Sequence, residues 1–83
     1  MKKASPEVRK ALIDAIKIQL KENNPPETKQ AFIRLLCDGI PEEDVYIYLA
    51  QALAYEMYAS MKEERSYDNQ NYAKLLAKLP HLE

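Results

Sequence analysis

The sequence predicts an all-α fold: a compact four-helix domain with short connections and a long third helix. Helix-start residues recur along the chain, and the apolar residues between them follow the i, i+3, i+4 spacing of one helix face. No segment alternates apolar and polar residues as a half-buried strand does. With 83 residues, the chain is long enough for one small core. We therefore predict one helical domain over residues 1–80 and a tail over residues 81–83, in which Leu82 and Glu83 resemble the remnant of an expression tag.

The first helix is expected to run from Pro6 to about Glu22. Ser5 belongs to the residue types that cap helix N-termini. Proline is tolerated in the first turn because its missing N–H would have no partner there. The core face of this helix is predicted from the helical spacing of its apolar residues. It consists of Val8, Ala11, Leu12, Ala15 and Ile16.

A second helix is expected from Pro26 to about Cys37. Asn24 is its expected N-cap, with Glu27 as the acid of a capping box. Gly39 is the only glycine in the chain, and it follows the apolar pattern at the point where a left-handed residue commonly ends a helix. We expect it to end this helix in that conformation. The predicted core face consists of Thr28, Ala31, Phe32, Leu35 and Leu36.

The third and longest helix is expected from Pro41 to about Lys62. Its first turn is rich in acidic residues, which the positive end of a helix dipole favours. A fourth helix is expected from Asn69 to about Leu79, with Asp68 as its N-cap. The inward face of the third helix is predicted to contain Val45, Leu49, Ala52, Leu53, Met57 and Ser60, and that of the fourth Tyr72, Leu75, Leu76 and Leu79.

The charge balance argues against two classes of partner. The chain carries 12 basic and 13 acidic residues, a net charge of −1. Proteins that bind nucleic acids or membrane surfaces usually display an excess of basic residues, so we expect no nucleic-acid partner and no membrane. No apolar run approaches the roughly 18 residues of a membrane span. A single Cys cannot form an internal disulfide and no leader pattern precedes the first helix, so the expected location is cytoplasmic.

The residue counts also leave little basis for catalysis or metal binding. One Cys and one His cannot form a structural zinc site. A single glycine excludes both the phosphate-binding loop and the dinucleotide fingerprint. No nucleophile is paired with a base in the sequence. We therefore predict no catalytic, cofactor-binding or metal-binding residue, no cofactor and no enzymatic activity.

Two polar residues on inward faces are the candidate buried polar residues. Glu56 lies in the middle of the apolar face of the third helix, where an unpaired carboxylate would be costly. We expect it to accept hydrogen bonds from the N-terminal amides of another helix or from a tyrosine hydroxyl. The alternatives are an acid that lines a small pocket and an acid exposed at a groove. Gln19 on the first helix either pairs with Glu56 or a tyrosine or, as we favour, reaches water at the core margin.

Apolar and tyrosine residues outside the expected core faces predict a binding surface. The chain has six tyrosines and one phenylalanine, and a tyrosine suits both a core margin and an interface because its hydroxyl can remain wet. We predict a protein–protein interaction module that binds another protein or a second copy of itself. The alternative is a small-ligand-binding domain or an enzyme, with Glu56 and tyrosine hydroxyls at a pocket. The candidate interface residues are Ile13, Leu20, Ile33, Tyr48, Tyr55 and Tyr58.

Several of these features together resemble a known family. They are the start Asn24-Pro25-Pro26-Glu27, the stop at Gly39, the segment Ala54-Tyr55-Glu56-Met57-Tyr58, and the pair Tyr67-Asp68 with Tyr72. Over about residues 6–80, the chain resembles small uncharacterised bacterial helical domains related to domain of unknown function 1841. The resemblance implies an all-helical fold and a bacterial source, and it implies no activity. Family members often carry histidines on the first and third helices, which this chain lacks, so no metal role follows.

Overall fold

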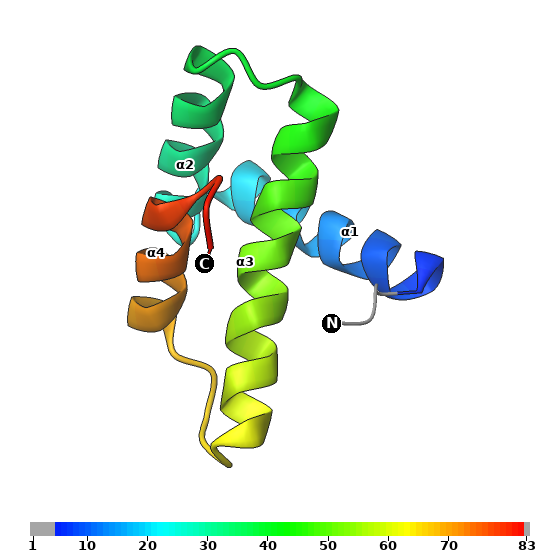
Figure 1. Cartoon of the computed structure of the whole chain (residues 1–83), viewed down its shortest axis with the longest axis vertical. Helices are drawn as coiled ribbons and strands as arrows, with labels where there is room; N and C mark the ends of the chain where they lie inside the picture. Colours follow the sequence, from blue (N-terminus) through cyan, green and yellow to red (C-terminus); the bar gives the residue numbers. More distant parts are fainter. Residues whose placement is uncertain (1–4, 83) are drawn as a thin grey trace.

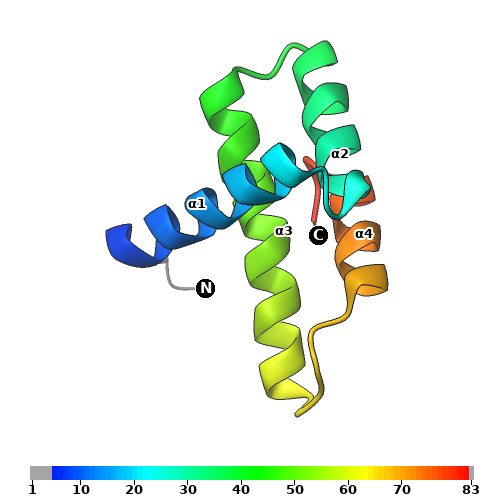
Figure 2. The same ribbon diagram turned by 180° about the vertical axis from the view of Figure 1, so that it is seen from behind.

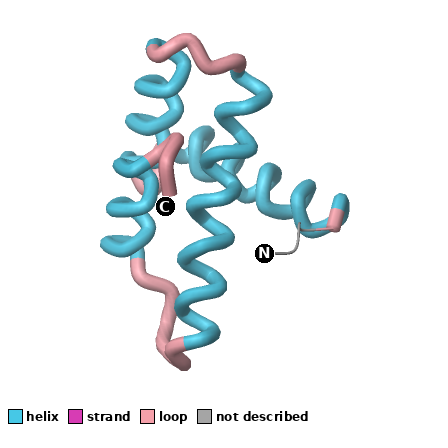
Figure 3. Tube along the Cα trace, viewed as in Figure 1, coloured by secondary structure: helices cyan, strands magenta, loops and turns pink. Residues whose placement is uncertain are grey.

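The computed structural model describes residues 5–82, which form four helices joined by short loops (Figures 1 and 3). This part of the chain contains no strand, and none of its helices is long and apolar enough to cross a membrane. The all-α prediction is confirmed, and each helix begins and ends within one residue of its expected bounds. The helices are α1 (Pro6–Glu22), α2 (Pro26–Cys37), α3 (Glu42–Lys62) and α4 (Asn69–Lys78).

α3 is the central helix, and the other three helices all pack against it. α2 and α4 lie along one side of α3, whereas α1 crosses α3 at a steep angle (Figures 1 and 2). The N-terminal half of α1 projects beyond α3, away from α2 and α4, and the C-terminal half of α3 extends past the crossing. We call the face of α3 that packs against α2, α4 and the loop before α4 the closed side. We call the face of α3 that none of these covers the open side.

The core lies around the inward face of α3. Leu12, Ile13 and Leu20 of α1 are partly buried and pack against it, so α1 contributes a broader face than its predicted stripe. The apolar core residues are Ile16, Ala31, Leu35, Val45, Leu49, Ala50, Ala52, Leu53, Tyr72, Leu76 and Leu79.

Four residues that were predicted on core faces are exposed instead. They are Val8, Ala11, Leu36 and Met57. Val8 and Ala11 belong to the half of α1 that projects beyond α3, and Met57 lies in α3 past the crossing. Leu36 lies in the last turn of α2. Apolar spacing identifies the inward face of a helix, but it does not show how far along that face a neighbouring helix reaches.

One residue of the predicted C-terminal tail contacts the core. Leu82 is partly buried and packs against it. Glu83 lies outside the described residues.

Three of the predicted helix ends are confirmed: the caps at Ser5 and Asp68 and the stop at Gly39. The Ser5 hydroxyl accepts a hydrogen bond from the N–H of Val8 at 3.2 Å and caps α1. Gly39 has φ +88°, and the N–H of Ile40 donates to the carbonyl of Leu35 at 3.2 Å. This is the hydrogen-bond pattern of a helix that ends at a left-handed residue.

The predicted capping box of α2 is wrong. Because α2 begins at Pro26, Pro25 occupies the N-cap position and forms no side-chain cap. Asn24 lies one residue too early, and its N–H instead donates to the carbonyl of Gln19 at 3.0 Å. Asn24 therefore closes α1 rather than opening α2.

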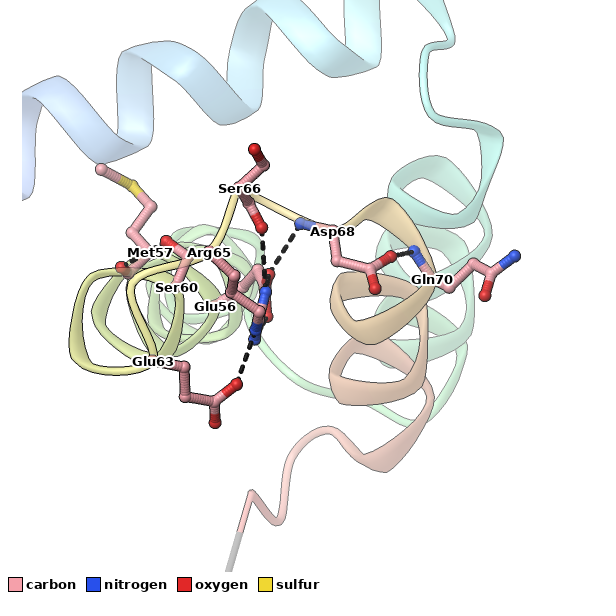
Figure 4. Close-up of polar contacts among 8 residues, drawn as sticks. All are labelled: Glu56, Met57, Ser60, Glu63, Arg65, Ser66, Asp68 and Gln70. Atoms are coloured by element: carbon pink, nitrogen blue, oxygen red, sulfur yellow. Dashed lines mark hydrogen bonds and ion pairs between the residues drawn. The ribbon is translucent and has the colours of Figure 1, made fainter.

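α3 ends in the same manner as α2, but Glu64 takes the place of a glycine, with φ 52°. The N–H of the next residue, Arg65, donates to the carbonyl of Ser60 at 2.9 Å. A left-handed conformation costs a non-glycine residue roughly 1–2 kcal/mol. The bend turns the chain back, so that the Arg65 side chain lies against α3 (Figure 4).

Candidate functional site

Glu56 lies at the centre of a polar cluster between α3 and the start of α4 (Figure 4). It is only 1% exposed. Arg65 donates from Nη1 to Oε2 at 2.7 Å and from Nη2 to Oε1 at 3.2 Å. The backbone N–H of Asp68 donates to Oε2 at 2.7 Å. Both carboxylate oxygens therefore have hydrogen-bond donors.

The same arginine holds the loop between α3 and α4. Its Nε donates to Oε1 of Glu63 at 2.6 Å, and its Nη1 donates to the carbonyl of Ser66 at 3.0 Å. Asp68 in turn caps α4, because its Oδ1 accepts from the N–H of Gln70 at 2.8 Å. These bonds fix the end of α3 to the start of α4.

The electrostatics of this cluster favour the charged form of Glu56. The hydrogen bonds from Arg65 lower the pKa of Glu56 from its ordinary value of 4.5, burial opposes them, and the Asp68 N–H and the Arg65 charge lower it further. The bonds to Glu56 and Glu63 raise the pKa of Arg65. The ion pair is therefore charged at neutral pH. Such a carboxylate has no proton to donate, and its oxygens are already engaged.

Sequence reasoning anticipated one contact of Glu56 and missed the other. The bond from Asp68 is the expected contact with a backbone amide at the start of another helix. Arg65 was not considered, although a buried acid requires compensating charge or donors and Arg65 follows closely after the same helix. Its position depends on the left-handed bend at Glu64, which the sequence does not signal. A tyrosine hydroxyl, the other expected donor, is not among the contacts of Glu56 in the described residues.

Gln19 belongs to a second polar cluster, which joins α1, α2 and α4. Its Oε1 accepts from the hydroxyl of Thr28 at 2.7 Å and from the hydroxyl of Tyr72 at 2.8 Å. Thr28 and Tyr72 are fully buried, and Gln19 is half-buried. Burial raises the pKa of Tyr72, and the bonds with Thr28 and Gln19 act against this. Of the two expectations for Gln19, the less favoured one, pairing with a tyrosine, is confirmed by the bond from Tyr72, and the side chain remains partly exposed at the core margin.

A third polar contact joins α2 to the end of α4 and was not predicted. Arg34 donates from Nη1 to the carbonyl of Leu79 at 2.9 Å and from Nη2 to the carbonyl of Leu76 at 3.0 Å. The last carbonyls of a helix have no partner within the helix, and a cation there also suits the helix dipole. α4 is therefore held at both ends, by Asp68 and by Arg34.

The polar clusters are saturated. Within residues 5–82, every buried side-chain nitrogen and oxygen has a hydrogen-bond partner. The same residues contain no group of three or more side chains that could hold a metal ion. What the clusters supply is rigid attachment of α4 to the rest of the fold.

The candidate interface residues separate into two groups. Four of them are half-buried: Ile13, Leu20, Tyr48 and Tyr55. The first three pack against the core and form its margin. Ile33 and Tyr58 are 50% and 64% exposed, so only these two lie fully on the surface.

The most exposed apolar cluster was only partly predicted. Met61 is 77% exposed, and Met57 is 46% exposed. With Tyr58 they are neighbours on the last turns of α3, because residues three and four positions apart share a helix face. Figure 4 shows Met57 directed away from α4. We call Met57, Tyr58 and Met61 the Met61 patch. The available signal in the sequence was the i, i+4 spacing of Met57 and Met61, with Tyr58 beside them.

Comparison of the chain with protein-family models, with curated proteins and with solved structures gave no match. The resemblance to domain of unknown function 1841 therefore stays a prediction.

Proposed function

We propose that this domain is a protein–protein interaction module whose binding surface is the Met61 patch on the open side. The observation that carries the proposal is the exposure of three adjacent large apolar side chains on the projecting half of α3. Clustered exposed apolar residues commonly mark interaction sites. Methionine and tyrosine are both enriched at interfaces, and the flexible methionine side chain adapts to varied partners.

The polar side chains of the clusters already have hydrogen-bond partners, which supports a binding function over a catalytic one. An acid–base or nucleophilic site needs a group that can exchange a proton or attack a substrate. Glu56 is closed off by Arg65 and by a backbone amide, and the Tyr72 hydroxyl is committed to Gln19. The rival function, a ligand or substrate pocket at Glu56, therefore lacks an accessible polar group.

The proposal includes a setting for the domain. A bacterial source follows from the family resemblance. A reducing cytoplasm suits the single cysteine, because Cys37 is an exposed free thiol and such thiols persist where cellular reductants maintain them. The near-neutral charge balance favours a protein partner over nucleic acid.

Affinity capture tests the proposal. The tagged domain and its Met61→Glu variant would be used to capture proteins from a lysate of the source cell, with quantification by mass spectrometry. Ile18→Glu is the matched control, because Ile18 is 56% exposed on α1 and lies outside the patch. We expect Met61→Glu to lose a specific partner that the parent and Ile18→Glu retain. Equal capture by all three proteins would contradict the proposal.

A further inference from the structure

A shallow groove lies along α1 and next to the start of α3, and none of its lining residues belongs to the Met61 patch. One hollow lies between α1 and the start of α3, a second adjoins it on the surface of α1 alone, and Ile13 and Lys17 line both of them. The first hollow, of about 530 Å³, is bordered on the α3 side by Glu42, Glu43 and Tyr46. The second, of about 500 Å³, continues along α1 past Arg9, Lys10 and Asp14. We call the two hollows the α1–α3 groove.

The two walls of this groove carry opposite charges. Lys10 is paired with Asp14 at 3.0 Å, which leaves Lys17 as the basic wall of the first hollow, and Arg9 adds positive charge further along α1 in the second. The first turn of α3 supplies Glu42 and Glu43 as the acidic wall. Within residues 5–82, no ion pair of 4.0 Å or less joins the walls.

The floor between the walls is apolar. Ile13 and Tyr46 are partly buried and pack against the core, and the Nζ of Lys17 lies 5.7 Å from the centre of the Tyr46 ring. An apolar floor between exposed charges has the anatomy of a small interface, with an apolar centre and a polar rim.

We infer that the α1–α3 groove binds the same groove of a second copy of this chain. In a two-fold symmetric contact the same patch meets itself, so the patch must be self-complementary. A two-fold axis that runs along the groove places the basic wall of each copy opposite the acidic wall of the other. Lys17 then faces Glu42 and Glu43 of the second copy twice in one contact, and Arg9 extends the basic side of each copy along α1.

Charge complementarity decides between a second copy and other occupants. A uniformly charged partner, such as a nucleic acid, would be attracted by one wall and repelled by the other. A second copy matches both walls by symmetry. The ion pairs at such a rim are exposed, so the association is weak and sensitive to salt.

Sedimentation with charge-reversed variants tests this inference. In Glu42→Lys/Glu43→Lys both walls are basic, and in Arg9→Glu/Lys17→Glu both are acidic. We expect the parent to dimerise at concentrations up to about 1 mM in low salt, and to weaken by about tenfold or more at high salt. Each variant alone should dimerise at least about tenfold more weakly than the parent. An equimolar mixture of the two should form a heterodimer, which also shows that both variants are folded.

Lys74→Glu/Lys78→Glu is the matched control, because it reverses two exposed lysines of α4 that do not line the groove. It should dimerise as the parent does. A parent that remains a 9.6 kDa monomer throughout overturns the inference, and so does a dimer that persists in both charge-reversed variants. Neither result affects the proposed function, which depends on the Met61 patch and is tested by the loss of partner capture in Met61→Glu.

Discussion

The two sides of α3 differ in how far other helices cover them. On the closed side, α2 and α4 cover α3, and three polar contacts centred on Glu56, Gln19 and Arg34 fix α4 in place. On the open side, α1 crosses α3 once, and the Met61 patch remains exposed. The buried polar side chains on the closed side all have hydrogen-bond partners. The apolar side chains of the Met61 patch are exposed because no other described helix covers them. The comparison assigns stability to one side and binding to the other.

The largest expected effect is on the closed side. Glu56→Ala leaves Arg65 and the Asp68 N–H without their acceptor, and it should lower the free energy of unfolding by about 2–3 kcal/mol. Glu63→Ala is the control, because Glu63 contacts the same arginine from an exposed position and should cost less than about 1 kcal/mol. Chemical denaturation measures both. A Glu56→Ala protein as stable as the parent would indicate that Glu56 serves function at the expense of stability.

The pH dependence of stability should come from the same residue. Because the folded-state pKa of Glu56 lies below its ordinary value of 4.5, its contribution is present above that value and is lost as pH falls through the folded pKa. The stability difference between the parent and Glu56→Gln should therefore shrink as pH falls below 4.5. Denaturation series at several pH values measure this difference. A difference that stays constant with pH would show that Glu56 is not charged in the folded protein.

Tyr72→Phe should cost about 1 kcal/mol, because it removes one hydrogen bond to Gln19 and leaves that oxygen with Thr28 alone. Tyr58→Phe is the matched control on the open side, where the hydroxyl is exposed and its loss should be neutral. Urea unfolding of the two variants compares the two sides with the same chemical change. Equal effects would remove the distinction between them.

Gly39→Ala measures how much the left-handed backbone conformation between α2 and α3 costs a residue other than glycine. A Cβ on Gly39 would meet no atom within 4 Å, so its cost is the left-handed conformation itself, about 1 kcal/mol. Glu64→Gly should have the opposite sign and a smaller size, because it relieves the same strain and adds freedom to the unfolded chain. Thermal melting measures both shifts. Shifts of the same sign would contradict the assigned helix ends.

The sequence predicts the helices well because their signals are local. Ser5 and Gly39 act within one turn of their position, and their geometry is as expected. The capping box at Asn24 failed because two successive prolines leave open which residue precedes the first helical turn. The polar clusters were harder to predict, because they join residues that lie far apart in the sequence and meet only in the folded structure.

Contacts between distant residues account for the rest of what was missed. Arg65 reaches Glu56 only after the bend at Glu64, and Arg34 reaches the end of α4 across 45 residues. Likewise, Val8 and Met57 have apolar spacing on an inward face, but the crossing angle of α1 leaves them uncovered. Periodicity gives the direction of a side chain, and only packing shows whether another element is there to meet it.

Parallel urea denaturation of the parent, Glu56→Ala and Met61→Glu tests the division between the two sides most directly. If the closed side supplies stability and the Met61 patch is free for binding, Glu56→Ala should unfold at clearly lower urea. Met61→Glu should then unfold with the parent, within about 0.5 kcal/mol, as substitutions on an exposed surface usually do. A Met61→Glu protein destabilised as much as Glu56→Ala would contradict the division, because it would place Met61 in the packing that holds the fold together.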